Sequence, residues 1–120
     1  MRRPSRKNGP KRGLQDLKLR GILREIKETL SRQVGKHFQL ILFGSYARNE
    51  GQPDSDVDLM VILPDRICTF ALKEQVRDAV AEFSLRSDYF FSVMIVSESM
   101  ARQYQGFQVF DAVEKEGVPL

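Results

Sequence analysis

The sequence holds 120 residues, 42% of them apolar, so it can bury one modest core and leaves no room for a second substantial domain. Its formal net charge is +3, and its one cysteine, Cys68, excludes an internal disulfide and a cysteine-based zinc cluster. No apolar run is long enough for a membrane span or a secretion signal, and we therefore expect a single-domain cytoplasmic protein.

The positive charge is concentrated in residues 1–13, which contain six cations and no acid. Without them the chain has 13 basic and 16 acidic residues, a net charge of −3, which does not favour binding of a polyanion. Because the segment is rich in Pro, Gly, Ser, Lys and Arg, we predict a disordered basic tail ahead of a folded domain at 14–120. Contact with nucleic acid or a membrane through this tail is the alternative.

The first half of the domain contains one predicted helix and one predicted strand. Apolar residues at helical spacing begin at Leu14, and Gly35 stands where a C-terminal cap is expected. The apolar run 38–43 is too short for a helix and ends at Gly44, which predicts a largely buried strand. The polar segment that follows, up to Ser55, is predicted to be a loop or a short helix.

The second half repeats this alternation. Residues 56–63 form an apolar run closed by Pro64, and residues 69–86 have helical spacing. The β-branched and aromatic run 89–96 predicts a third strand, Ser97 can cap a short helix after it, and a last helix ends at Gly117. Strands that alternate with helices predict the α/β (α+β) class, one sheet with helices packed on it.

Two carboxylates, Asp56 and Asp58, stand two residues apart in the second predicted strand, so the pleat sends both to one face. Two neighbouring anions repel, and oxygen ligands of this kind suit Mg²⁺, which prefers few carboxylates together with substrate phosphates. A turn in which Asp side chains bond backbone amides is the alternative. That alternative explains Asp54 and Ser55, but it does not explain Asp58 inside an apolar run.

Gly44 and Ser45 follow the end of the first predicted strand, where glycine allows backbone amides to approach a ligand closely. Unpaired amides at the start of a turn or helix favour phosphate, and Arg48, one turn further on, could reach a phosphate oxygen. Taken alone, Gly-Ser after a strand is more typical of a plain turn, and Arg48 is more typical of a surface ion pair.

Together these two groups resemble a known family. Leu42-Phe-Gly-Ser-Tyr-Ala-Arg48, followed by Pro53-Asp-Ser-Asp-Val-Asp-Leu59, resembles the signature of the minimal nucleotidyltransferases of the DNA polymerase β superfamily. That signature is Gly-Ser, about ten residues, then Asp-x-Asp. The resemblance covers roughly residues 38–96, and 107–118 is similar to the family's C-terminal helix.

The resemblance implies a nucleotidyltransferase fold with a mixed β-sheet and flanking helices, ATP as the substrate bound at Gly44 and Ser45, and one or two Mg²⁺ ions on Asp56 and Asp58. Family members usually supply a third carboxylate from a later strand. Here Phe90 occupies its expected position, and Asp88 is the candidate third ligand or general base. Asn49 also replaces a glycine that often follows the arginine.

The resemblance further implies a partner. Small members of this kind are commonly antitoxins of all-helical HEPN ribonuclease toxins, which they bind, modify with AMP on a tyrosine, or both. We therefore predict a Mg²⁺-dependent nucleotidyltransferase that acts on a partner toxin, with a non-catalytic antitoxin as the main alternative. A nucleic-acid adaptor that uses the basic tail is less consistent with the acidic body. His37 and Cys68 are predicted to be surface or packing residues.

Overall fold

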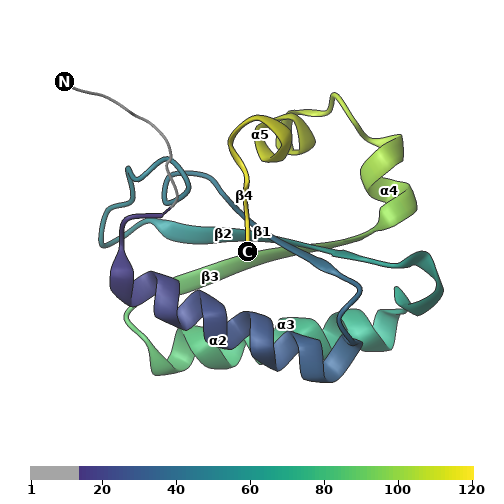
Figure 1. The fold of residues 1–120 in the computed structure, drawn as a ribbon, viewed down its shortest axis with the longest axis horizontal. Coiled ribbons are helices and arrows are strands. Elements are labelled where there is room, and N and C mark those ends of the chain that lie inside the picture. Colours follow the sequence, from purple (N-terminus) through teal and green to yellow (C-terminus); the bar gives the residue numbers. More distant parts are fainter. Residues whose placement is uncertain (1–13) are drawn as a thin grey trace.

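A computed structural model describes residues 14–120, and the predicted basic tail at 1–13 lies outside the described residues. Two long helices, α2 and α3, cover one face of a mixed sheet, and two shorter helices, α4 and α5, cover part of the other face (Figure 1). The elements in chain order are α2 (Leu17–Val34), β1 (Gln39–Phe43), β2 (Asp56–Leu63), η2 (Asp65–Ile67), α3 (Phe70–Arg86), β3 (Phe90–Ser97), α4 (Glu98–Gln103), α5 (Gln108–Glu116) and β4 (Val118–Pro119).

Local capping residues set the bounds of the long helices. The Asp16 side chain accepts a hydrogen bond from the Leu19 amide at the start of α2, and Thr69 does the same for the Leu72 amide at the start of α3. Gly35 ends α2 with a φ of 85°, and its amide donates to Ser31 O. A left-handed residue of this kind favours glycine, so α2 ends where the sequence predicted.

The sheet has the strand order β3-β2-β1-β4. β2 lies antiparallel to β1 and parallel to β3, and α3 makes the crossover that a parallel pair requires. β4 pairs antiparallel with β1 through only two residues, Val118 and Pro119. This register places the end of β1 beside the start of β2, and the start of β2 beside the start of β3.

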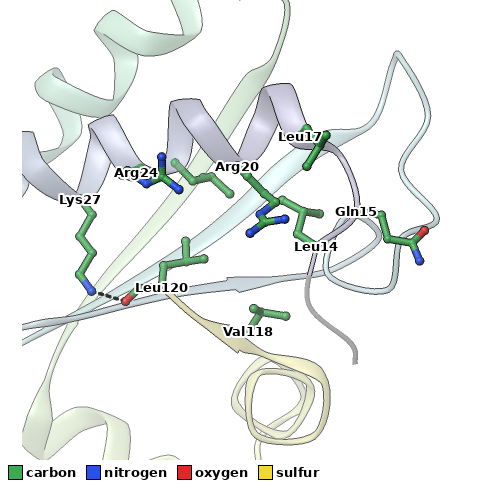
Figure 2. A pocket seen from close by; sticks show the side chains of 9 residues that line it. Leu14, Gln15, Leu17, Arg20, Arg24, Lys27, Val118 and Leu120 are labelled. Carbon is green, nitrogen blue, oxygen red and sulfur yellow. Dashed lines mark hydrogen bonds between the residues drawn. The ribbon is translucent and has the colours of Figure 1, made fainter. Parts of the chain in front are cut away.

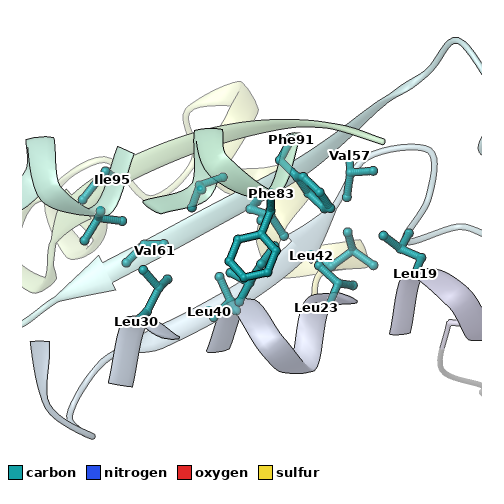
Figure 3. Packing of buried hydrophobic residues seen from close by; sticks show 14 of the residues in the cluster. Leu19, Leu23, Leu30, Leu40, Leu42, Val57, Val61, Phe83, Phe91 and Ile95 are labelled. Carbon is teal, nitrogen blue, oxygen red and sulfur yellow. The ribbon is translucent and has the colours of Figure 1, made fainter. Parts of the chain in front are cut away.

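The main core lies between the sheet and the helices α2 and α3 (Figure 3). Alternate strand residues such as Leu42, Val57 and Phe91 point into it and meet Leu23 and Phe83 from the helices. A smaller core on the other face joins Met60, Ile62 and Val96 to residues of α4 and α5. Asp56 and Asp58 belong by the same alternation to this second face, at the end of β2 that the smaller core does not reach.

The predicted fold class is confirmed, and two local features differ from the prediction. Residues 44–49 form consecutive turns, which agrees with the loop, one of the two structures predicted for this segment. The short helix η2 and the strand β4 were not predicted, because a three-residue helix and a two-residue strand containing Pro119 are too short to produce a periodic pattern. No helix within 14–120 combines the length and the apolar composition needed to cross a membrane.

Candidate active site

The site is built where β1 ends against the start of β2. In the antiparallel register Phe43 pairs with Asp58, which brings the next residue, Gly44, alongside the Asp58 side chain. A Cβ placed on Gly44 would lie 2.3 Å from Asp58 Oδ2, and Gly44 has a φ of 78°. Both the space and the backbone conformation therefore require glycine at this position.

The two predicted carboxylates, Asp56 and Asp58, share one face but differ in their surroundings. Asp56 is exposed, whereas Asp58 is half-buried. Burial and then the neighbouring Asp56 charge raise the pKa of Asp58 above its ordinary value, and the positive charge of Arg48 opposes them. The ionised form of Asp58 is therefore disfavoured in the folded protein, and a nearby cation would stabilise it.

The segment after Gly44 folds back on itself through backbone hydrogen bonds. The Ala47 and Arg48 amides donate to Gly44 O at 3.1 and 3.3 Å, and the Glu50 amide donates to Ser45 O at 2.8 Å. The first donor of this series is Ala47, so the amides of Ser45 and Tyr46 take no part in the turn's own bonds. Backbone amides released in this way at the start of a turn are suited to phosphate oxygens.

Asn49, which stands where the related signature often has glycine, has a φ of 58°. Asparagine tolerates this left-handed region better than most residues do. The Asn49 side-chain oxygen also accepts a hydrogen bond from the Gln15 amide at 2.8 Å. The substitution therefore preserves the turn and adds a link from the turn to the segment that precedes α2.

Two tyrosines that the sequence analysis did not single out hold this turn in place. Tyr46 is buried, its hydroxyl donates to Gln52 O at 2.8 Å, and its ring meets the Tyr89 ring edge to face at 5.9 Å. The Tyr89 hydroxyl donates to Asp16 Oδ2 at 2.8 Å. The aromatic residue after Gly-Ser was visible in the sequence, but its pairing with Tyr89 depends on the fold.

Arg48 is held by two acids. Its Nε lies 2.9 Å from Glu50 Oε1, and its Nη1 lies 3.1 and 3.2 Å from the two carboxylate oxygens of Glu116 on α5. These contacts raise the pKa of Arg48 further above its ordinary value. The surface ion pair considered from the sequence is therefore present, and the same guanidinium still acts on Asp58 through its charge.

The structure does not bring Asp88 to the carboxylate pair. Asp88 Oδ2 lies 2.8 Å from Lys18 Nζ on α2, the helix that covers the opposite face of the sheet, and this pair lowers the pKa of Asp88. Phe90 is the β3 residue in register with Asp56, and it is 61% exposed. Within 14–120 no group of three or more His, Cys, Asp or Glu side chains is placed so that it could hold a metal ion.

A mixed sheet with flanking helices, and a glycine turn packed against one of two carboxylates that share a face of β2, are typical of the nucleotidyltransferase class of fold. The sequence profile of the nucleotidyltransferase domain matches residues 23–104. A protein of Methanocaldococcus jannaschii, provisionally named a protein adenylyltransferase, is 30% identical over 98 residues that cover 81% of this chain and 93% of the relative. The chain belongs to the nucleotidyltransferase domain family.

Solved structures agree on the fold. A provisionally assigned nucleotidyltransferase from Sulfolobus solfataricus superposes with a TM-score of 0.56 and 16% identity, covering 86% of this chain and 79% of the other. A provisionally assigned minimal nucleotidyltransferase superposes with a TM-score of 0.57 and 22% sequence identity, covering 83% of this chain and 94% of the other. A toxin–antitoxin structure with AMP-PNP superposes with a TM-score of 0.52 and 22% sequence identity, covering 79% of this chain and 69% of the other.

Proposed function

We propose that this chain is a Mg²⁺-dependent nucleotidyltransferase that transfers AMP from ATP to a hydroxyl group of a partner protein. The approach of Gly44 to Asp58 is the observation that carries the proposal. It puts a turn with released amides directly beside a carboxylate pair, so phosphates and a cation can be held together. The relative named as a protein adenylyltransferase supports AMP as the transferred group.

The residues present fit a divalent cation. Asp56 and Asp58 offer oxygen ligands from one face of β2, the negative charge that burial and Asp56 disfavour on Asp58 favours a cation, and Gly44 leaves no side chain in between. Asp56 and Asp58 would hold the ion, with Ser45 and the turn amides on the phosphates and Arg48 supplying positive charge nearby. Bound there, Mg²⁺ would supply charge stabilisation for the phosphoryl group and the leaving pyrophosphate.

In the transfer step the acceptor hydroxyl oxygen attacks the α-phosphorus of ATP. The bond from that phosphorus to the bridging oxygen breaks, pyrophosphate leaves, and the acceptor oxygen keeps the AMP. The hydroxyl proton must pass to a base, and the position beside Asp56 holds Phe90 rather than an acid. The base is then either Asp88, after its ion pair with Lys18 opens, or a group of the partner protein.

The partner that we propose is an all-helical HEPN toxin. The family resemblance implies it, and one structural neighbour is a toxin–antitoxin structure with AMP-PNP. Phe90 at the position of the third acid favours a second candidate, an antitoxin that binds and masks its toxin without turnover.

The experiment combines the chain, α-labelled ATP and the protein encoded by the adjacent gene, with Mg²⁺ or with EDTA. We expect label on the partner and free pyrophosphate only with Mg²⁺, and ATP binding measured by calorimetry should weaken strongly in EDTA. Equal ATP affinity with and without the metal would remove Mg²⁺ from the site. Tight binding of the partner without label transfer would favour the masking antitoxin.

A further inference from the structure

A hollow lies between α2 and β4, apart from the carboxylate pair (Figure 2). Its volume is about 870 Å³. Asp56, Asp58, Gly44 and Ser45 are not among the residues that line this hollow. The helix α2 covers the face of the sheet opposite to Asp56 and Asp58. Among residues 14–120, none that lines it is acidic or aromatic. We call this feature the α2–β4 groove, and its lining residues are Leu14, Gln15, Leu17, Arg20, Leu23, Arg24, Lys27, Val118 and Leu120.

The inner wall of the α2–β4 groove is aliphatic. Leu14 and Leu23 are almost fully buried and form its base, and Val118 and Leu120 on the β4 side are half-buried. Leu17, in the first turn of α2, also lines the groove and is 73% exposed. Apolar surface left open in this way is favourable to cover with other apolar groups.

Three cations of α2 line the same groove. Arg20, Arg24 and Lys27 are spaced by four and three residues, so they form one stripe along the helix. Figure 2 shows Arg20 and Lys27 reaching from α2 toward β4, where Lys27 Nζ donates to Leu120 O. No ion pair among residues 14–120 involves Arg20 or Arg24, and like charges at this spacing repel one another.

These properties select the chemistry of the occupant. The chain's own residues 1–13 carry six cations and no acid, so like charge disfavours them in the groove. A nucleic acid could neutralise the cations, but the groove offers no aromatic ring for base stacking, and a sugar-phosphate backbone would not cover its aliphatic wall. A polypeptide that carries carboxylates and aliphatic side chains together satisfies both halves of the groove.

We propose that the α2–β4 groove binds an acidic amphipathic segment of a partner protein. Its carboxylates would meet Arg20 and Arg24, and its aliphatic side chains would cover Leu17, Leu23 and Val118. The proposal does not rest on nucleotidyl transfer, because the groove and the carboxylate pair share no residue. A partner held here would leave the Gly44–Asp58 face open.

The test is a titration of the isotope-labelled chain, followed by NMR, with a synthetic helical peptide of about 14 residues that has Leu at helical spacing and Glu elsewhere. We expect shifts at Leu17, Arg20, Arg24, Lys27 and Val118, and an affinity that falls as salt is raised. Three comparison ligands complete the series: the peptide with Glu replaced by Lys, the peptide with Leu replaced by Ser, and an oligouridine of similar length. Each should bind at least about tenfold more weakly.

The variant R20E/R24E should bind the acidic peptide at least about tenfold more weakly, and K36E/R66E is the control that reverses two exposed cations outside the groove. If R20E/R24E unfolds, R20Q/R24Q takes its place. Absent binding, binding unchanged in the groove variant, or equal affinity for the Ser-substituted peptide would overturn the proposal. Oligouridine binding at the same residues without peptide binding would assign the groove to nucleic acid instead. Each of these results would leave the proposed ATP site at Asp56 and Asp58 unaffected.

Discussion

Gly44→Ala is the substitution that most directly tests the geometry of the candidate active site. The new Cβ would lie 2.3 Å from Asp58 Oδ2, whereas Cβ contacts shorter than 3.0 Å essentially never occur, so the carboxylate must move by about 0.7 Å. A misplacement on the order of 1 Å can cost about 100-fold in rate. We expect AMP transfer to fall on the order of 100-fold and MgATP affinity to fall with it.

Gly35→Ala is the matched control. Gly35 has a φ of 85°, close to the 78° of Gly44, but nothing lies within 4 Å of an added Cβ. Both variants should therefore incur the cost of a positive φ in a non-glycine residue, on the order of 1–3 kcal/mol, which corresponds to a loss of roughly 4–8 °C in melting temperature for each kcal/mol. Only Gly44→Ala should lose nucleotide affinity and transfer.

Thermal unfolding, calorimetry with MgATP and label transfer to the partner are measured on both variants and on the wild type. If Gly44→Ala binds and transfers as well as Gly35→Ala, the contact between Gly44 and Asp58 has no part in the nucleotide site. If both variants lose melting temperature but keep full activity, Gly44 serves only the conformation of the turn.

Three further predictions concern single side chains. Asp58→Asn should lower AMP transfer by about 100-fold or more. Because the pKa of Asp58 is raised in the folded protein, its ionised form lowers the stability of the wild type at pH 7. Without metal the variant should therefore have a higher melting temperature than the wild type at pH 7, and this difference should disappear below the ordinary Asp pKa. Tyr89→Phe should lower the free energy of unfolding by about 1 kcal/mol in denaturant titrations. Burial and Asp16 favour the protonated phenol and raise the pKa of Tyr89 to about 12 in the folded protein. The difference between the variant and the wild type should therefore disappear as pH rises from the ordinary Tyr pKa near 10 toward about 12. Asp88→Asn should bind MgATP as tightly as the wild type in calorimetry, because Asp88 is paired with Lys18. If transfer is lost at unchanged affinity, Asp88 is the base. If transfer is retained, the base belongs to the partner protein.

The sequence predicted the helices and strands well wherever a local residue marks their ends. Gly35 and Ser97 act at the positions predicted for them, and β2 has the predicted bounds, 56–63. Each of these signals acts through hydrogen bonds or backbone angles within a few residues, so a short window of sequence contains it. The contact between Gly44 and Asp58 depends instead on the register of β1 against β2, which pairs Phe43 with Asp58.

Long-range side-chain partners could not be predicted in this way. Arg48 pairs with Glu116, 68 residues away, and Lys18 pairs with Asp88, 70 residues away. Exposed charged side chains have many possible partners in a sequence, and only the packing of α5 and α2 onto the sheet decides between them. The ion pair of Asp88 with Lys18 depends on that packing, so no short window of sequence contains it.

The hydrogen bond from Tyr89 to Asp16 bears on when the nucleotide site forms during folding. The hairpin of β1 and β2 contains Gly44, Asp56 and Asp58 and can close early, since its contacts are local. Tyr46, which steadies the turn, rests on Tyr89, and Tyr89 bonds to a residue 73 positions away. The hairpin can therefore assemble every proposed ligand before it can keep them rigid. We expect nucleotide affinity to appear only with the last docking step, when α2 meets β3.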